Sequence, residues 1–472
     1  MTDKNQFPPL IGRRRLLTAA AAAGLGTLPG CGGLGDESDT GTATDDARTD
    51  SPRTPTGNDP ADAAIEVPAT ARIDESISPT LSGLPPGERV SVEAATSTPG
   101  PDGPVDWSSS ATFAVGDGGT VTLGSQSPVA GDYDDADPMG LFWAMETDLA
   151  ARRALFPLRT HEVTITVTDT QGRALAETTT ERVLPSVEQE PLGDEFAGTV
   201  HYPPSDGPAP GVVLLHGSQP RELRGPARLL AANGFVAASL QYFGEPEPVP
   251  ETLVEVPVEY VVRACETLAA NDRVAGEQVG LYGASKGAEL ALLSGANSDV
   301  VGAVVSVSGG GLVWEGIESL GEAPDASSWT IDGEPVPYIP YPERQPTMSN
   351  GRAYYGDGFE AAAASTVEAA TIPVERIDGP VEFVAGSDDR LWNSPRYSRL
   401  ATDRLDGSEY DYAFDLTVYD GAGHSITPPF TPTYGSTQVG PLVLGGSPAA
   451  NATAAREHWP DVLSVLERGL SQ

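Results

Sequence analysis

The chain has 472 residues, which is enough for two or three domains with cores of their own. Asp and Glu number 67 against 28 Lys and Arg, so the formal net charge is −39, which disfavours nucleic-acid binding because a phosphate backbone would be repelled. The acidic residues are spread along the chain, and such a surface with few lysines indicates a high-salt environment, where charge repulsion is screened (a halophilic protein).

Residues 1–31 have the features of an export signal. Arg13, Arg14 and Arg15 form a twin-arginine-like start and precede a short Ala-rich apolar stretch that is too short to span a bilayer comfortably. The sequence ending at Cys31 resembles a lipoprotein processing site, so we expect Cys31 to be lipidated and to hold the protein at the outer face of the cell membrane. An uncleaved N-terminal anchor is the alternative. With Cys31 lipidated, Cys265 has no disulfide partner.

Residues 32–62 predict a disordered, acidic tether, because Ser, Thr, Asp, Gly and Pro dominate and no aromatic residue is present to build a core. Residues 63–190 contain short runs of alternating polarity separated by Gly and Pro turns, which predicts an all-β, immunoglobulin-like sandwich domain. These runs are Ala71–Ile77, Arg89–Ala94, Ala111–Val115, Thr120–Leu123 and Glu162–Val167. No charged group in them suggests chemistry, so we expect this domain to pack beside a catalytic one.

Residues 191–472 alternate between strand-like and helix-like stretches, which predicts an α/β domain with a mostly parallel sheet. The expected strands are 198–202, 211–215, 235–241, 279–282, 300–307, 381–385 and 414–419, and the expected helices are 221–233, 252–270, 286–296 and 450–470. Residues 309–373 interrupt the alternation with Gly, Pro, Trp and Tyr. We interpret them as a lid or pocket wall, with a plain surface excursion as the alternative.

The stretch Gly283-Ala-Ser-Lys-Gly287 matches G-x-S-x-G, and it lies between an apolar strand and a helix. That context turns the motif into a nucleophile elbow, the turn that carries the serine of α/β-hydrolases. Ser285 would be held in a strained backbone conformation with its Oγ exposed. A chance match in a Gly-rich chain is the alternative, and the flanking strand and helix argue against it.

A serine nucleophile needs a base, and in α/β-hydrolases the acid and then the histidine follow it along the chain. His424 lies in a Gly-rich loop after the strand 414–419 and is the predicted base, whereas His458 in the last helix is predicted to be structural. The predicted acid is Asp389, which lies three residues after Gly386, the residue that follows the strand 381–385. Asp388 is the alternative. The carboxylate of the acid would accept the N–H of His424 and fix the tautomer.

The oxyanion hole is predicted to use the backbone N–H of Lys286 and a second N–H from the loop after strand 211–215, from Ser218 or Gly217. His216 in that loop is predicted to shape the loop and to take no part in the chemistry. No cofactor and no metal ion enter this mechanism.

Several segments resemble the acyl-CoA thioesterase and bile acid-CoA:amino acid N-acyltransferase family. They are Trp107–Val115, Gly131–Tyr133, Asp137–Trp143, Leu230–Phe235, Gln241–Phe243, Gly283–Glu289, Asp388–Ser394, Gly423–His424 and Leu444–Ser447. The resemblance implies a β-sandwich followed by a dienelactone-hydrolase-like α/β-hydrolase domain, with Ser285, Asp389 and His424 as nucleophile, acid and base. Family acyltransferases that use amino-acid acceptors carry Cys at the nucleophile, so Ser285 looks like the hydrolytic branch.

The main hypothesis is a serine acyl hydrolase that cleaves acyl thioesters, with the acyl-CoA metabolism of fatty acids implied by the resemblance. The first alternative is an exported carboxylesterase or lipase-like hydrolase of oxygen esters, because the loop Leu215–Gln219 resembles that of general esterases. The second is a surface-binding lipoprotein with a vestigial triad. The expected partners are a small-molecule ester or thioester and, through Cys31, the membrane, while the sequence does not indicate an oligomeric state.

Overall fold

The computed structural model describes residues 63–100, 103–148, 156–245, 247–318, 324–341, 347–349, 352–354, 356–439 and 442–470. The predictions for residues 1–62, which include the export signal, Cys31 and the tether, lie outside these residues. No helix in the described part of the chain is both long and apolar enough to cross a membrane.

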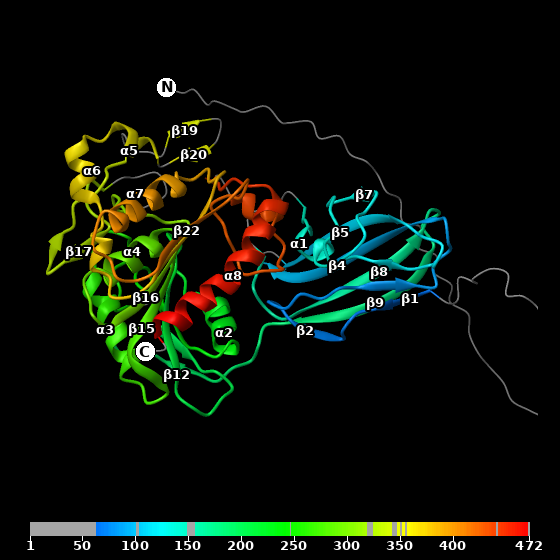
Figure 1. Ribbon diagram of the computed structural model, residues 1–472, viewed down its shortest axis with the longest axis horizontal. Helices are drawn as coiled ribbons and strands as arrows, with labels where there is room; N and C mark the ends of the chain where they lie inside the picture. The colour runs from blue at the N-terminus through cyan, green and yellow to red at the C-terminus, as the bar shows by residue number, and fades with distance from the viewer. Residues whose placement is uncertain are drawn as a thin grey trace, which may run out of the picture. The chain divides into compact units, whose positions relative to one another are not determined.

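The N-terminal part of the described chain is a β-sandwich of two sheets, as predicted (Figure 1). One sheet has the order β2-β9-β8-β4-β5-β7 and the other the order β1-β3-β6. Their strands are β1 (Ala64–Glu66), β2 (Thr70–Arg72), β3 (Thr80–Ser82), β4 (Arg89–Gly100), β5 (Gly103–Ala114), β6 (Val121–Thr122), β7 (Ala130–Gly131), β8 (His161–Asp169) and β9 (Ala174–Val183), and a short helix α1 (Gly140–Trp143) follows β7. Both sheets contribute to one core, because Val90, Val92 and Ala94 of β4 belong to the same hydrophobic cluster as Leu81 and Val121 of the smaller sheet.

The α/β domain is built on an eight-stranded sheet with the order β10-β11-β13-β12-β15-β16-β21-β22. The strands are β10 (Gln189–Pro191), β11 (Ala197–His201), β12 (Ala209–Leu215), β13 (Val236–Gln241), β15 (Val274–Ala284), β16 (Val301–Val307), β21 (Val381–Gly386) and β22 (Phe414–Tyr419). The strands from β13 to β22 are parallel, and β10 and β11 form an antiparallel edge. The sheet therefore begins at Gln189, two residues before the expected start of the domain at 191.

Helices cover both faces of this sheet, which explains why its strands are continuous apolar runs. Side chains of β12 alternate between two cores: Val213 and Leu215 face one and Val212 and Leu214 the other. The first core includes side chains of α3 (Val258–Ala269), α4 (Lys286–Gly295) and α7 (Ser394–Asp406), and the second includes those of α2 (Arg224–Ala232) and α8 (Pro448–Leu470). The helix expected at 252–270 begins only at Val258, because Val256–Pro257 form strand β14, which pairs with β17. Helix α7 was not expected.

The described residues within 309–373 form a set of short elements above the sheet, drawn mainly in yellow in Figure 1. They are β17 (Trp329–Ile331), β18 (Glu334–Pro335), β19 (Thr347–Ser349), β20 (Arg352–Tyr354), α5 (Asp357–Ala361) and α6 (Ala364–Ala370). A small core of Leu312, Trp314, Ile339 and Phe359 packs against Trp392 and Tyr397, which belong to the loop after β21 and to α7. A short pairing of β23 (Gln438–Val439) with β24 (Leu442–Val443) precedes α8.

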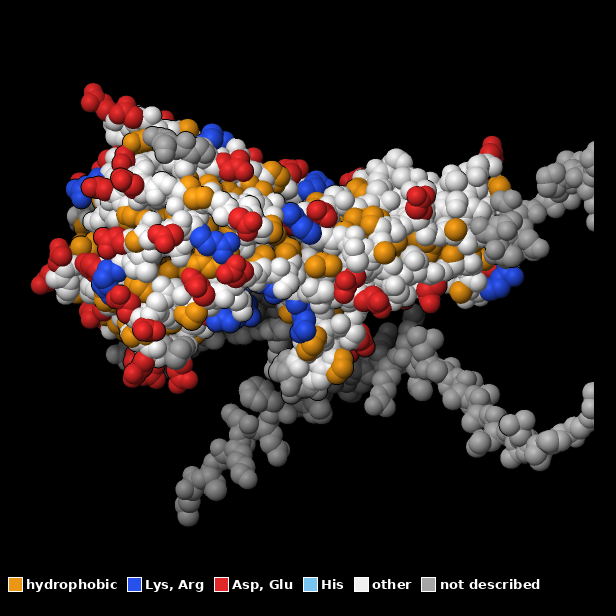
Figure 2. All heavy atoms as spheres, turned by 90° about the horizontal axis from the view of Figure 1, so that it is seen from below, with side chains coloured by type: hydrophobic (Ala, Val, Ile, Leu, Met, Phe, Trp, Pro, Cys, Tyr) orange, Lys and Arg blue, Asp and Glu red, His pale blue; other side chains and the backbone are white. Residues whose placement is uncertain are grey.

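The chain has a formal net charge of −39, and acidic side chains are visible at its surface (Figure 2). On the face drawn in Figure 2, Asp and Glu side chains are scattered over the α/β domain and outnumber Lys and Arg. Among the described residues, most Arg side chains at the surface form ion pairs with carboxylates, as in the pairs Arg404–Glu375, Arg396–Glu360 and Arg273–Glu188.

Candidate active site

Ser285 occupies a sharp turn between β15 and α4. Its backbone has φ 55° and ψ −120°, a left-handed conformation that non-glycine residues rarely adopt, and its N–H is held by the Val307 carbonyl at 2.8 Å. The glycines on either side are required by close backbone contacts. A Cβ on Gly283 would lie 2.2 Å from the Gly287 carbonyl oxygen, and a Cβ on Gly287 would lie 2.3 Å from the His216 carbonyl oxygen. The turn therefore has the geometry of a nucleophile elbow.

A continuous hydrogen-bond chain joins the three residues predicted to form a triad. His424 Nε2 lies 2.9 Å from Ser285 Oγ, and His424 Nδ1 lies 2.9 Å from Asp389 Oδ2. A carboxylate only accepts, so Nδ1 carries the proton and Nε2 is free to accept the serine proton. The three residues follow the carboxyl ends of the parallel strands β15, β21 and β22, which is where α/β sheets place their sites.

Asp389 and its neighbour Asp388 have different surroundings in the structure. The Asp389 side chain is fully buried, and besides His424 it accepts the backbone N–H groups of Leu391 and Trp392 and, at 2.6 Å, the Ser394 hydroxyl. The Asp388 side chain is 36% exposed; it pairs with Arg390 and accepts the N–H of Gly446. Only Asp389 is therefore placed to orient His424.

The segment Leu444–Gly446 clamps the loops that carry the acid and the base. The Leu444 carbonyl accepts the N–H of His424 at 2.8 Å and the N–H of Arg390 at 3.2 Å. A Cβ on Gly423 would lie 2.2 Å from the Gly445 carbonyl oxygen, so this approach tolerates no side chain. These backbone contacts were not predicted from the sequence. The hydrogen bond of Ser394 to the acid was not predicted either, although Asn393-Ser-Pro395 is typical of the start of a helix.

The predicted oxyanion donors border Ser285. Lys286 is the first residue of α4, where the N–H has no partner within the helix and the helix dipole favours negative charge. Gly217 lies against the serine, since a Cβ built on it would be 3.2 Å from Ser285 Cβ, and Ser218 lines the same pocket as Ser285. Both candidates for the second donor are thus close to the nucleophile.

His216 shapes the loop that carries these donors, as predicted from its position. Its ring is stacked on Tyr242 with centroids 4.1 Å apart, its Nδ1–H donates to the Gly217 carbonyl at 2.7 Å, and the Tyr242 hydroxyl donates to the His216 carbonyl. Burial lowers the pKa of His216 to about 4, so the ring stays neutral. His458 is likewise buried, and its Nδ1–H donates to the Ala454 carbonyl inside α8.

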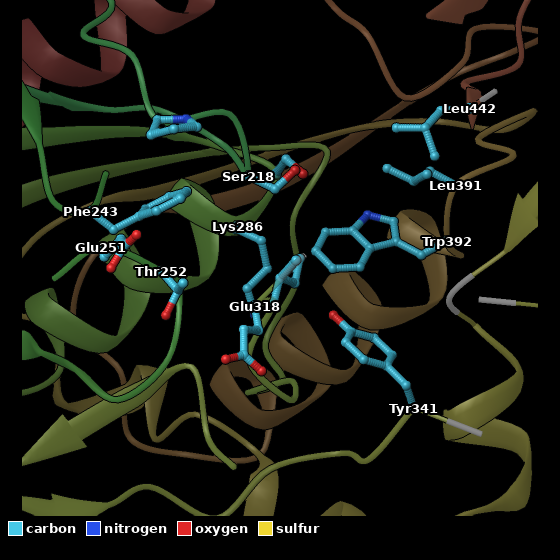
Figure 3. A pocket seen from close by; sticks show the side chains of 13 residues that line it. Ser218, Phe243, Glu251, Thr252, Lys286, Glu318, Tyr341, Leu391, Trp392 and Leu442 are labelled. Atoms are coloured by element: carbon cyan, nitrogen blue, oxygen red, sulfur yellow. The ribbon is translucent and has the colours of Figure 1, made fainter. Parts of the chain in front are cut away.

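A pocket of about 240 Å³ opens beside Ser285. Its lining is Ser218, Pro220, Phe243, Glu251, Thr252, Ser285, Lys286, Ile317, Glu318, Tyr341, Leu391, Trp392 and Leu442. In Figure 3, Tyr341, Trp392, Leu391 and Leu442 lie on one side of it, and Phe243, Glu251 and Thr252 lie on the other. The walls are mostly apolar, and Ile317, Glu318 and Tyr341 come from the segment 309–373.

The chain is similar in sequence to a family of known proteins. Two sequence profiles match the chain: "Acyl-CoA thioester hydrolase/BAAT N-terminal region" over residues 74–193 and "BAAT / Acyl-CoA thioester hydrolase C terminal" over residues 256–472. The peroxisomal succinyl-coenzyme A thioesterase of Mus musculus is 28% identical over 86% of this chain and 97% of its own length. Acyl-coenzyme A thioesterase 1 of Homo sapiens is 29% identical over 75% and 84%.

Other similar proteins have names that refer to different activities. Acyl-coenzyme A amino acid N-acyltransferase 1 of Mus musculus is 26% identical over 86% of this chain and 98% of its own length. Among solved structures, a putative dienelactone hydrolase from Klebsiella pneumoniae matches 60% of this chain and 100% of its own, with 15% identity and a TM-score of 0.38. Since both halves of the family are matched in order by the two profiles, the chain belongs to the acyl-CoA thioester hydrolase and bile acid-CoA:amino acid N-acyltransferase family.

Proposed function

We propose that the protein is a serine acyl hydrolase that cleaves acyl thioesters through an acyl-enzyme on Ser285. The observation that carries this proposal is the hydrogen-bond chain from Ser285 Oγ through His424 to the buried carboxylate of Asp389. The pocket beside Ser285, with its apolar walls, offers room for an acyl group.

The proposed reaction has two steps that use the same groups. In the first, Ser285 Oγ attacks the acyl carbonyl carbon, its proton passes to His424 Nε2, and the backbone N–H groups of Lys286 and of Ser218 or Gly217 hold the oxyanion. The C–S bond then breaks, and His424 returns the proton to the departing thiolate. In the second step His424 takes a proton from water, the hydroxide attacks the acyl-enzyme, and the acid leaves as Ser285 regains its proton.

Oxygen esters are the second candidate substrate, and the charge around the pocket favours them. Glu251 and Glu318 line the pocket, and Lys286, the one cation among the described lining residues, is paired with Glu289. Coenzyme A carries several phosphate charges that such a lining would repel. A small neutral leaving group would meet no such barrier.

The test compares substrates and the nucleophile in high salt. Full-length protein should be labelled by a fluorophosphonate and should hydrolyse acyl-CoA or 4-nitrophenyl esters, and Ser285→Ala should lose labelling and nearly all turnover. The ratio of the two substrates' kcat/KM decides between thioesters and oxygen esters. An unlabelled, inactive wild-type protein would instead support a binding protein with a vestigial triad.

We also propose that the protein is exported and lipid-anchored through Cys31, which rests on the sequence of residues 1–31. A Cys31→Ser protein should be released to the medium or remain unprocessed. Complete membrane retention of a correctly cleaved Cys31→Ser protein would contradict the anchor.

A further inference from the structure

A buried carboxylate lies one helical turn beyond Ser285. Glu289 is 1% exposed and belongs to the first turn of α4. Its Oε1 accepts the backbone N–H of Trp314 at 2.9 Å and the indole N–H of Trp329 at 2.5 Å, and its Oε2 lies 2.8 Å from Lys286 Nζ. The signal in the sequence is a lysine and a glutamate, Lys286 and Glu289, three positions apart at the start of a helix whose next residues are apolar.

The partner of Glu289 is the residue whose backbone N–H is the predicted oxyanion donor. The Lys286 side chain is 3% exposed, and its Nζ lies 5.3 Å from the centre of the Trp329 ring. Burial lowers the pKa of Lys286 and raises the pKa of Glu289, and their mutual attraction opposes both shifts. Removing two charges from water is unfavourable and can cancel the attraction between them, so a gain in stability does not by itself explain why this ion pair is buried.

One of the two donors to Glu289, Trp314, is connected to the wall of the pocket. Trp314 lies three residues before Ile317, which lines the pocket. The centroid of the Trp314 ring is also 5.8 Å from that of Trp392, another lining residue. The Trp392 ring in turn meets the His424 ring edge-on, with centroids 5.7 Å apart. One carboxylate thus connects the helix start behind the nucleophile with the wall of the pocket and, through two indoles, with the base.

We propose that Glu289 is a positioning residue for the hydrolysis, which holds the start of α4 and the pocket wall at Trp314 in a fixed relation. Its oxygen Oε1 does this by accepting two N–H groups from the segment 309–373, while Oε2 fixes the Lys286 side chain. Glu289 acts through these neighbours and does not touch the substrate. This role rests on the proposed function, because a fixed oxyanion donor matters only if Ser285 attacks a carbonyl group.

The experiment compares Glu289→Gln with Glu289→Leu. Both variants remove the charge and the oxygen that faces Lys286, but only Gln keeps a carbonyl oxygen for the two tryptophan donors. We expect kcat per active site, with sites counted by fluorophosphonate titration, to be about tenfold or more lower in Glu289→Leu than in Glu289→Gln, since small misplacements of catalytic groups have effects of this size. KM for a short 4-nitrophenyl ester should change far less than kcat.

Glu382 supplies the matched control, because it is also a buried carboxylate but lies on β21 and does not line the pocket. Glu382→Gln and Glu382→Leu should differ in melting temperature and agree in kcat per site. Equal kcat per site in the two Glu289 variants would overturn the positioning role. If Glu289→Leu does not fold, Trp329→Phe removes the indole donor while Glu289 stays in place, and an unchanged kcat per site in that variant would overturn the positioning role too. A fully active Ser285→Ala protein would instead overturn the proposed function itself.

Discussion

The two neighbouring aspartates at the end of β21 have different surroundings, so their substitutions should have different costs. Asp389→Asn should keep the fold but lower kcat on the order of 10⁴-fold, because an amide that donates to His424 favours the wrong tautomer. Asp388→Asn disturbs only the contacts with Arg390 and Gly446 and should cost far less. The measurement is kcat per titrated site. A larger loss for Asp388→Asn than for Asp389→Asn would show that Asp388, and not Asp389, is the acid.

Ser285 also predicts which acceptor resolves the acyl-enzyme. An oxygen ester on serine reacts less readily with amines, relative to water, than a thioester on cysteine does. Wild-type protein should therefore release free acid even with glycine or taurine present at high concentration. Ser285→Cys should hydrolyse esters more slowly but pass a larger fraction of acyl groups to the amine. Mass spectrometry of the acid and amide products gives the ratio, and mostly amide from the wild type would refute hydrolysis.

At the scale of elements, the turn between β15 and α4 depends on how closely α4 approaches the loop after β12. A Cβ on Gly287 would meet the carbonyl oxygens of His216 and Leu215 at 2.3 and 2.4 Å, and neither backbone atom can move aside cheaply. Gly287→Ala should therefore destabilise the protein by about 1–3 kcal/mol and abolish fluorophosphonate labelling. Gly207→Ala is the control, since its Cβ would meet nothing within 4 Å. Wild-type labelling of Gly287→Ala would contradict the close packing.

The elements that could be predicted from the sequence are those with a clear pattern in their own residues. The parallel strands are covered on both faces, so they appear as unbroken apolar runs, and the short motif around Ser285 is local. Strand β9 and helix α7 were missed because both are rich in polar residues: the only fully buried residues of β9 are Thr180 and Arg182, and two of the six buried residues of α7 are serines. The Leu444 clamp and the contacts of Glu289 join residues far apart in the chain. No local pattern reports such contacts.

At the scale of the whole molecule, one buried carboxyl should make stability depend on pH. Burial, together with the nearby Asp415 and Asp461, raises the pKa of Glu382 from 4.5 to about 7, although Thr417 and Arg468 oppose the shift. The folded state therefore binds more protons than the unfolded state between these values. The contribution of Glu382 to stability is present below about pH 4.5 and is lost as the pH rises through about 7.

Glu382→Gln should remove this dependence. The shift corresponds to roughly 3 kcal/mol at most, so the unfolding free energy of the wild type should fall more steeply between about pH 5 and about pH 8 than that of the variant. Denaturant titrations of both proteins at the two pH values give the comparison. Parallel pH profiles for wild type and variant would show that Glu382 is not protonated in the folded state.

The order of the three site residues along the chain also has a consequence for how the protein matures. Ser285 and His424 are separated by 139 positions, and His424 follows β22, the last strand to be added and an edge of the sheet. A growing chain therefore acquires its nucleophile early and its base only when the sheet is almost complete, because distant pairings form late. During refolding, competence for fluorophosphonate labelling should return after the far-ultraviolet circular dichroism signal, and simultaneous recovery would contradict this order. An incompletely folded copy would then carry a serine that cannot yet attack anything.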